Sequence, residues 1–304
     1  MTTGVRTVPK KKSKKRWDMF LIALPLMVLV FIFSYLPLLG WALSFFEYKP
    51  GTPLLSNEYV GFKYFEMILT SRDIRRVMTN TVIFALINFC LLPLPMIFAI
   101  MLNEINSAGF RKVAQTLTTL PHFISWIIVY SLAFAIFSTE GMLNEVLKML
   151  GLKPQKLLQD KDAVYWFQTC ISQWKTLGWS SIIYIAAITG IDQQMYEAAA
   201  VDGAGKLRCA IHITIPGLLP TFIVVSLLAV ANFMNSGLDQ YFMFQNPVVM
   251  KKIEVLDLYT YRVGLQKQDY SYATAVGMLK SLISLVMLFV TNAIAKRVRG
   301  ESIV

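Results

Sequence analysis

The chain has 304 residues, of which 56% are hydrophobic and only 15% are charged, and its formal net charge is +11. Because a soluble domain needs a charged surface, this balance excludes an ordinary water-soluble protein and indicates a lipid bilayer. The long unbroken apolar runs also exclude a β-barrel, whose strands are short and alternate between apolar and polar residues.

Six stretches approach the roughly 20 apolar residues that a transmembrane helix needs. They are Met19–Phe46, Thr79–Leu102, Leu120–Phe137, Trp166–Gly190, Gly217–Met234 and Thr274–Ala295. Lipid offers the backbone no hydrogen-bond partner, so each stretch is expected to be helical. The sequence therefore predicts an all-α, polytopic membrane protein with about six transmembrane helices.

A basic tail over residues 1–16 precedes the first of these helices. Its clustered cations are Lys10, Lys11, Lys12, Lys14, Lys15 and Arg16. Basic residues directly before an apolar stretch indicate a cytoplasmic N-terminus, and nucleic-acid binding is the weaker interpretation of the same charge. A secretory signal peptide is also disfavoured, because the apolar run exceeds the ~7–15 residues of such a signal.

The rest of the chain divides in the order of the spans. Residues 17–78 are expected to form the first transmembrane helix and an outer loop, and residues 79–296 the core transmembrane domain. An even number of spans returns the C-terminus to the cytoplasm, as a short tail over residues 297–304. The basic residues Lys296, Arg297 and Arg299 agree with that side.

The inner segment over residues 191–216 carries the most information. Gln193–Asp202 is rich in helix formers, and Gly203 can end that helix in a left-handed backbone conformation. Lys206–Ile215 predicts a second short helix, and Pro216 suits the first turn of the next span. This helix–turn–helix is either a docking element for a cytoplasmic partner or an interfacial element that only connects two spans.

The same segment resembles the EAA loop of ABC importer permeases. The matching residues are Glu197-Ala198-Ala199, Asp202-Gly203-Ala204 and Ile213-Thr214-Ile215-Pro216, in the family's types and spacing. One departure is Ala210, where many relatives have a large aromatic residue, and it affects one packing contact of the second helix.

Further matches extend along nearly the whole chain and are most similar to the carbohydrate-uptake class, in the branch that handles oligosaccharides. They are Asn80-Thr81, Leu102-Asn103-Glu104, residues 120–126, Trp174-Lys175, Gly178-Trp179, Asn246-Pro247, Tyr259, Gly264-Leu265 and residues 271–275. Singly each is weak, and together they point to one family.

The resemblance implies the type I importer permease fold in a bacterial cytoplasmic membrane, with both termini in the cytoplasm. It assigns ATPase coupling to Glu197, Ala198, Ala199, Asp202, Gly203, Ala204 and Pro216. The implied partners are a second related permease, two cytoplasmic ATPases, and an extracellular or periplasmic solute-binding protein that delivers an oligosaccharide. No nucleic acid is expected.

The chain itself is not expected to hydrolyse ATP. Its nearest approach to a phosphate loop, Gly203–Leu207, has Ala200 in place of the first glycine and Leu207 in place of the hydroxyl that binds Mg²⁺. ATP and Mg²⁺ would therefore bind the partner ATPase. No nucleophile–base set predicts a membrane-embedded enzyme, and no cysteine or histidine spacing predicts a metal site or disulfide.

Polar and aromatic side chains inside the predicted spans are candidates for a substrate pathway. They are Lys175, Trp174, Trp179, Tyr184, Asn232, Asn235 and Lys280. A lysine near a bilayer centre costs about 2.5–3.5 kcal/mol, so each lysine either faces the pathway or an internal ion pair, or extends to the outer interface. The asparagines either line the pathway or tie helices together, and the aromatic residues either contact sugars or form interfacial belts.

The rival function is a secondary transporter or channel driven by an ion gradient. That class predicts acidic residues in the middle of spans, and the six stretches contain almost none.

Overall fold

The computed structural model describes residues 14–299, and within that range every regular element is a helical segment. The predicted tails at residues 1–16 and 297–304 lie largely outside the described residues. Five segments of the described chain are long and apolar enough to cross a membrane. They are Met19–Phe45, Arg72–Asn103, Trp126–Met149, Lys206–Ala231 and Tyr270–Ala293. The all-α, multi-span architecture is therefore confirmed.

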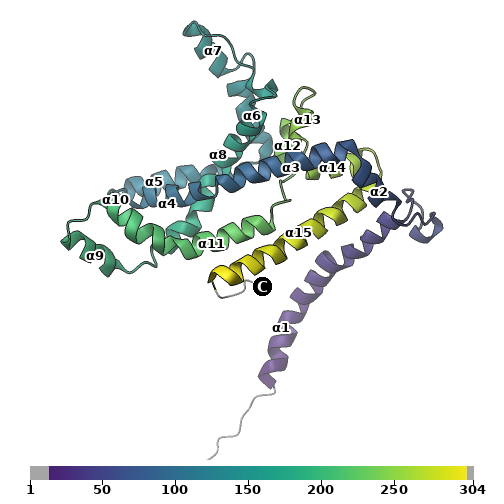
Figure 1. Ribbon diagram of the computed structural model, residues 1–304, viewed down its shortest axis with the longest axis horizontal. Helices are drawn as coiled ribbons and strands as arrows, with labels where there is room; N and C mark the ends of the chain where they lie inside the picture. The colour runs from purple at the N-terminus through teal and green to yellow at the C-terminus, as the bar shows by residue number, and fades with distance from the viewer. Residues whose placement is uncertain (1–13, 300–304) are drawn as a thin grey trace, which may run out of the picture.

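The first span leaves the body of the molecule, as Figure 1 shows. It consists of α1 (Lys14–Val30), a π-helical turn η1 (Phe31–Tyr35) and a 3₁₀ segment η2 (Leu36–Phe45). The π turn ends where the Leu36 N–H donates to the Phe31 carbonyl, directly before Pro37. A proline lacks the N–H of a regular helix and its ring collides with an earlier carbonyl, and the π turn accommodates this defect.

The second span is broken near its middle. A short helix α2 (Lys63–Thr70) leads into α3 (Arg72–Cys90), which Ser71 caps by accepting a hydrogen bond from the Ile74 N–H. The chain then turns before Pro93 and continues as α4 (Pro93–Asn103), because a proline is favourable at the start of a helix and not inside one.

The third predicted span is interrupted rather than continuous. The expected inner loop holds α5 (Ala108–Thr119), followed by a 3₁₀ turn η4 (Leu120–Phe123) and then α6 (Trp126–Phe137). Ile124 and Ser125 take extended backbone conformations between the two helices. Beyond α6 the chain forms α7 (Met142–Met149), which projects from the body in Figure 1, and a short turn η5 (Leu157–Gln159).

The fourth predicted span is α8 (Val164–Ile188), a helix of 25 residues. It is long enough to cross a bilayer but is not among the five apolar segments. Its polar side chains Gln168, Thr169, Lys175 and Ser181 are buried, because α8 packs against α4, α5 and α11 in the interior of the fold. A helix surrounded by protein does not need the apolar surface that lipid demands.

The second half of the chain begins with α9 (Gln193–Val201) and α10 (Lys206–Cys209). A π turn η6 (Ala210–Thr214) leads into α11 (Ile215–Ala231). Residues 235–273, called the outer segment below, then fold into three short helices, α12 (Asp239–Phe244), α13 (Met250–Ile253) and α14 (Leu256–Tyr261). A third π turn η7 (Arg262–Gln266) precedes the last helix, α15 (Tyr270–Arg299).

Residues in the middle of α3 hold the outer segment in place. The Asn80 side-chain amide donates to the carbonyls of Lys251 (2.9 Å) and Glu254 (3.1 Å). The Thr81 hydroxyl accepts from the Leu256 N–H at 2.9 Å. These contacts fasten α13 and α14 to α3, and they give the Asn80-Thr81 pair a structural role.

A buried ion cluster strengthens the same junction. Glu254 is fully buried, and its carboxylate pairs with Arg262 at 2.5 Å and with Arg76 at 3.1 Å. Burial raises the pKa of the Glu254 carboxyl, while the two guanidinium groups act in the opposite direction. The cluster links three parts of the chain: α3 through Arg76, the residues before α14 through Glu254, and η7 through Arg262.

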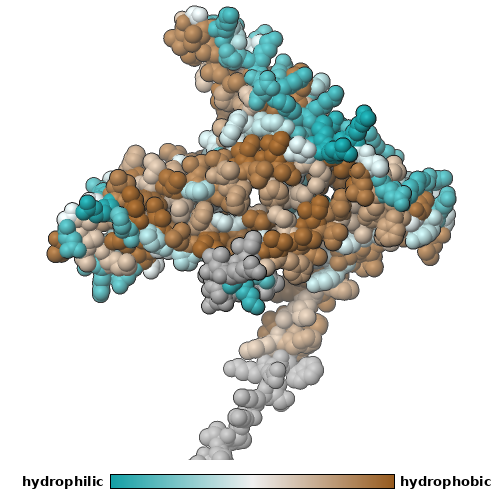
Figure 2. Space-filling view, in the orientation of Figure 1, coloured by the Kyte–Doolittle hydropathy of each residue, from teal (hydrophilic) through white to brown (hydrophobic). Residues whose placement is uncertain are grey.

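The two ends of the body differ in what they present. In Figure 1, α9 and α10 lie at one end, while α2, α13 and α14 lie toward the other. Figure 2 shows apolar side chains across the middle of the body and hydrophilic ones over both ends. This distribution fits a bundle that crosses a membrane with α9 and α2 on opposite sides.

Candidate functional site: an exposed elbow and a polar cavity

The first candidate site is the elbow formed by α9 and α10. The Asp192 carboxylate caps α9 by accepting from the Gln194 N–H at 2.9 Å. The helix ends at Asp202, and Gly203 takes φ +73°, a conformation that favours glycine. The Ala204 N–H then returns to the Ala199 carbonyl at 2.9 Å. This turn confirms the predicted role of Gly203 in ending the helix.

The surface of the elbow is exposed and mixed in character. Glu197, Ala198, Asp202 and Gly203 are exposed, whereas Ala199 and Ala204 are half-buried. Among the described residues neither Glu197 nor Asp202 belongs to an ion pair. Apolar side chains are exposed beside these acids, namely Met195, Val201 and Leu207, with Val201 at 89%. The elbow therefore presents carboxylates and apolar side chains together on one exposed surface.

Two polar contacts tie the elbow to the bundle. The hydroxyls of Tyr196 and Thr214 are 2.9 Å apart, and Thr214 is buried at the start of α11. Lys206 donates to the Glu104 carbonyl at 2.8 Å and to the Asn106 side chain at 2.7 Å. The elbow is therefore linked both to α11 and to the connection between α4 and α5.

The expected second short helix of the elbow does not end before Pro216. Residues Lys206–Ala231 form one continuous helical segment through α10, η6 and α11. The Ile215 N–H donates to the Ala210 carbonyl, five residues back, so the π turn absorbs the missing N–H of Pro216. The α10 part of the elbow is thus joined to the membrane-spanning part of α11 by unbroken helix.

The second candidate site is an open cavity of about 930 Å³ between α11, α14, η7 and α15. Three predicted pathway residues line it: Asn232, Asn235 and Lys280. The other polar residues of its lining are Asp257, Thr260, Tyr261, Tyr270, Thr274, Ser281 and Ser284. Amides, hydroxyls and aromatic rings on an apolar wall are the groups that hold sugars by hydrogen bonds and stacking.

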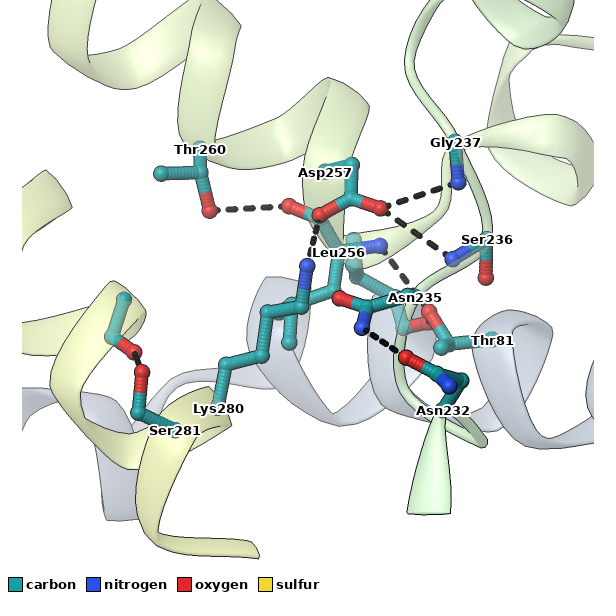
Figure 3. Close-up of polar contacts among 12 residues, drawn as sticks. Thr81, Asn232, Asn235, Ser236, Gly237, Leu256, Asp257, Thr260, Lys280 and Ser281 are labelled. Atoms are coloured by element: carbon teal, nitrogen blue, oxygen red, sulfur yellow. Dashed lines mark hydrogen bonds and ion pairs between the residues drawn. The ribbon is translucent and has the colours of Figure 1, made fainter. Parts of the chain in front are cut away.

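Figure 3 shows Asp257 among several polar partners. One carboxylate oxygen accepts from the backbone N–H groups of Ser236 and Gly237, each at 3.1 Å. The other oxygen pairs with the ammonium of Lys280. Lys280 therefore lies in an internal ion pair, one of the two arrangements that its position in the sixth span allowed.

A smaller cavity of about 130 Å³ adjoins the first and shares Asn232 and Asn235 with it. Asn88 also lines this space, and its side-chain carbonyl accepts from Gln173 at 3.4 Å. The Asn235 amide donates to the Asn232 side-chain carbonyl at 3.1 Å. A series of carboxamides thus runs from α8 through α3 to the end of α11.

The remaining predicted pathway residues do not line the larger cavity. Lys175 is buried, and its ammonium donates to the carbonyls of Pro121, His122 and Ile124 at 3.1, 2.7 and 2.6 Å. It therefore satisfies backbone carbonyls at the break between α5 and α6. This arrangement differs from the pathway, the internal ion pair and the outer interface that the sequence suggested for it. The ring of Trp126 lies 5.4 Å from the same ammonium.

The three aromatic candidates on α8 have different surroundings. Trp179 stacks in parallel on the His122 ring at a centroid distance of 4.6 Å. Trp174 is 44% exposed, and Tyr184 is buried in the core with Met96 and Leu218. These placements leave Asn232, Asn235 and Lys280 as the predicted pathway residues that come together.

Sequence reasoning missed Asp257, Thr260, Tyr261 and Tyr270 as lining residues. All four lie within residues 235–273, between the fifth and sixth apolar stretches of the sequence. The signal was available, because an unpaired lysine at position 280 needs a carboxylate partner inside the protein. Asp257 lies in α14, which precedes η7 and α15, and it supplies this carboxylate.

Comparisons with known proteins place this architecture. Residues 91–300 match the family described as "Binding-protein-dependent transport system inner membrane component". The chain is 34% identical to Protein LplB of Bacillus subtilis (strain 168) over 98% of this chain and 100% of the relative. It is 35% identical to the polygalacturonan/rhamnogalacturonan transport system permease protein YteP of the same organism, over 97% of this chain and 95% of the relative.

A solved structure agrees with these relatives. A chain of the bacterial alginate ABC transporter, crystallised with an alginate pentasaccharide-bound periplasmic protein, superposes with a TM-score of 0.87 and 30% sequence identity. The superposition covers 95% of this chain and 98% of that chain.

Proposed function

Because the chain belongs to the binding-protein-dependent transport inner membrane component family, we propose that it is the permease subunit of an ATP-driven oligosaccharide importer. The proposal rests most directly on the exposed elbow around Gly203, whose acids and apolar side chains lack partners among the described residues. The comparisons favour this class over an ion-gradient transporter.

In this function the elbow is the docking element for a cytoplasmic ATPase. Glu197 offers a carboxylate to a cationic cleft, and Ala198, Ala199 and Ala204 let that surface approach closely. Asp202 and Gly203 form the turn at its tip. Closure of the ATPases on ATP and Mg²⁺ pushes the elbow, and the unbroken path through η6 and Pro216 carries that push into α11.

A second permease completes the pathway. The most apolar stretch of the first span has no buried residue, although η2 at its end packs against α15. An isolated apolar helix of this length is covered by lipid and by a partner of the same fold. The assembly lies in a bacterial cytoplasmic membrane, with both termini of this chain and the elbow on the cytoplasmic side.

An oligosaccharide is the proposed cargo, and an external solute-binding protein delivers it. The similar chains are named for polygalacturonan or rhamnogalacturonan transport, for arabinooligosaccharides and for alginate. The cavity that holds Asn232, Asn235 and Lys280 is the proposed part of the pathway in this chain, because its amides and hydroxyls suit sugar hydroxyl groups.

A charge reversal in the elbow tests the docking role. We expect Glu197→Lys to weaken association of the ATPase at least tenfold, and to lower ATP-dependent uptake in parallel, because a cation replaces an exposed anion that faces the cleft. Co-purification of the subunits and uptake into proteoliposomes measure the two effects. Glu145→Lys on α7 is the matched control, since Glu145 is also exposed but lies in the projecting α7. Normal association and uptake by a well-inserted Glu197→Lys protein would refute the docking role.

A further inference from the structure

Asp257 is the one acidic side chain in the lining of the large cavity as the described residues form it. Its carboxylate is only 18% exposed and has three partners from two different elements. Two partners are backbone N–H groups of the turn after α11, and the third is the Lys280 ammonium on α15. The side chain therefore connects α14, the end of α11 and α15 at one point (Figure 3).

The turn that Asp257 holds carries two of the cavity amides. It runs from Asn232 to Gly237, and Gly237 takes φ +81°. Within the turn, the Asn235 N–H donates to the Asn232 carbonyl at 2.8 Å, and their side chains are bonded as well. These local contacts fix the two asparagines relative to each other, whereas Asp257 fixes the turn relative to the cavity wall.

The support behind Asp257 is rigid. The Leu256 N–H next to it is bonded to Thr81 of α3, and Thr260 bonds back to the Leu256 carbonyl at 2.8 Å. Glu254, three residues earlier, sits in the buried cluster with Arg76 and Arg262. Asp257 thus projects from an anchored helix toward two elements whose polar groups face the cavity.

We propose that Asp257 is a positioning residue of the translocation cavity, a role that rests on the proposed import function. It places Asn232 and Asn235 opposite α15 and keeps the Lys280 ammonium at a defined point of the wall. Polar groups that are already ordered bind a ligand more tightly, because no entropy is lost in ordering them. A turn that is free to move therefore weakens sugar binding and lowers the amount of sugar carried in each transport cycle.

Hydrogen exchange measures the positioning directly. In the complete complex, we expect Asp257→Ala to accelerate amide exchange in the peptide containing Ser236 and Gly237 by about tenfold, because a charge-assisted acceptor is removed. Lys280→Gln leaves that acceptor in place and should keep the protection. Asp239→Ala is the matched control, since Asp239 is exposed nearby and does not line the cavity.

Transport supplies the functional readout as the ratio of sugar taken up to ATP hydrolysed. We expect Asp257→Ala to lower this ratio at least fivefold, since an unpaired Lys280 and a released turn act together. The double variant Asp257→Asn, Lys280→Gln keeps an acceptor oxygen for the turn and removes both charges, so it should recover more than half of the ratio. It also carries the test if Asp257→Ala does not assemble.

Three results would overturn the proposal. One is unchanged exchange at Ser236 and Gly237 in Asp257→Ala. Another is a freed turn with an unchanged ratio of sugar to ATP. The last is a double variant that recovers neither protection nor transport. If the wild-type complex took up no oligosaccharide at all, the import function would fail, while the exchange result would still report on the turn.

Discussion

Individual charged residues in this chain divide into those that hold the fold and those that are free to meet a partner. Glu254 and Lys175 are buried, and all of their described contacts are internal. Glu197 and Asp202 are exposed on the elbow and have no ion-pair partner within residues 14–299. Burial and partners, rather than residue type, therefore separate the charges that hold the fold from those that stay exposed.

Removing the carboxylate of Glu254 is expected to be costly. Glu254→Ala removes the carboxylate that the half-buried Arg76 and Arg262 share, and loss of hydrogen bonds to a charged group costs about 1–3 kcal/mol. The thermal unfolding midpoint of the purified protein in detergent measures this loss. Glu47→Ala removes half of an exposed pair with Lys63 and should leave the midpoint within error. Equal midpoints for the two variants would contradict the structural role of the cluster.

A methyl group at Gly178 is expected to separate α8 from the end of α5. A Cβ built on Gly178 would lie 2.2 Å from the Thr118 carbonyl oxygen, which belongs to the backbone and cannot rotate away. Gly178→Ala should therefore destabilise the protein by about 1–3 kcal/mol. Gly109→Ala on α5 is the control, because nothing lies within 4 Å of its added methyl group. The same detergent unfolding assay compares the two variants, and a stable Gly178→Ala would show that the helices do not approach this closely.

The role of Lys175 can be separated from a pathway role by one substitution. Lys175→Met keeps the length of the side chain and removes the donor that satisfies three carbonyls at the break between α5 and α6. We expect the unfolding midpoint to fall and uptake per correctly assembled complex to stay near that of the wild type. A stable variant that assembles normally but no longer transports would instead place Lys175 on the pathway.

At the scale of single elements, the sequence predicted helices better than it predicted where they bend. The apolar runs located every span, and Gly203 ended α9 as expected. The break at Ile124 and Ser125 and the π turn before Pro216 were missed. Hydropathy does not detect such features. The break depends on Lys175, which satisfies the freed carbonyls from a distant helix, and the π turn depends on the missing N–H of Pro216.

The outer segment shows a second limit of sequence reasoning. Residues 235–273 are polar enough to look like a loop, yet they form α12, α13 and α14 and supply Asp257 to the cavity. Their position depends on contacts with Asn80 and Thr81, which lie about 170 residues earlier in the chain. Pairing over such a distance leaves no local pattern to detect.

The contact between Tyr196 and Thr214 predicts how the elbow transmits motion. The two hydroxyls join α9 to the π turn at the start of α11. We expect Tyr196→Phe to leave ATPase association unchanged and to lower uptake about twofold to fivefold, since one hydrogen bond of about 0.5–1.5 kcal/mol is lost from the link. Association and uptake are measured on the same preparation. Unchanged uptake would show that the continuous helix alone carries the motion.

At the scale of the whole molecule, the two candidate sites occupy different positions along the bundle. The elbow lies at one end, the anchored outer segment lies at the other, and α11 connects the elbow to the cavity between them. The exposed first span and the projecting α7 leave apolar surface for lipid and a second permease. In the proposed function this chain is one part of a larger assembly, and its elbow is the point at which the ATPase acts on it.

Thiol labelling at the elbow tests that claim most directly. In a background with Cys90, Cys170 and Cys209 changed to serine, Val201→Cys places a thiol at a residue of α9 whose side chain is highly exposed, and Met149→Cys places one on α7. A membrane-impermeant maleimide should label position 201 only in inverted vesicles, and the assembled ATPase should protect it, whereas position 149 should react in intact cells. Labelling of position 201 from outside, or with no protection by the ATPase, would contradict the account.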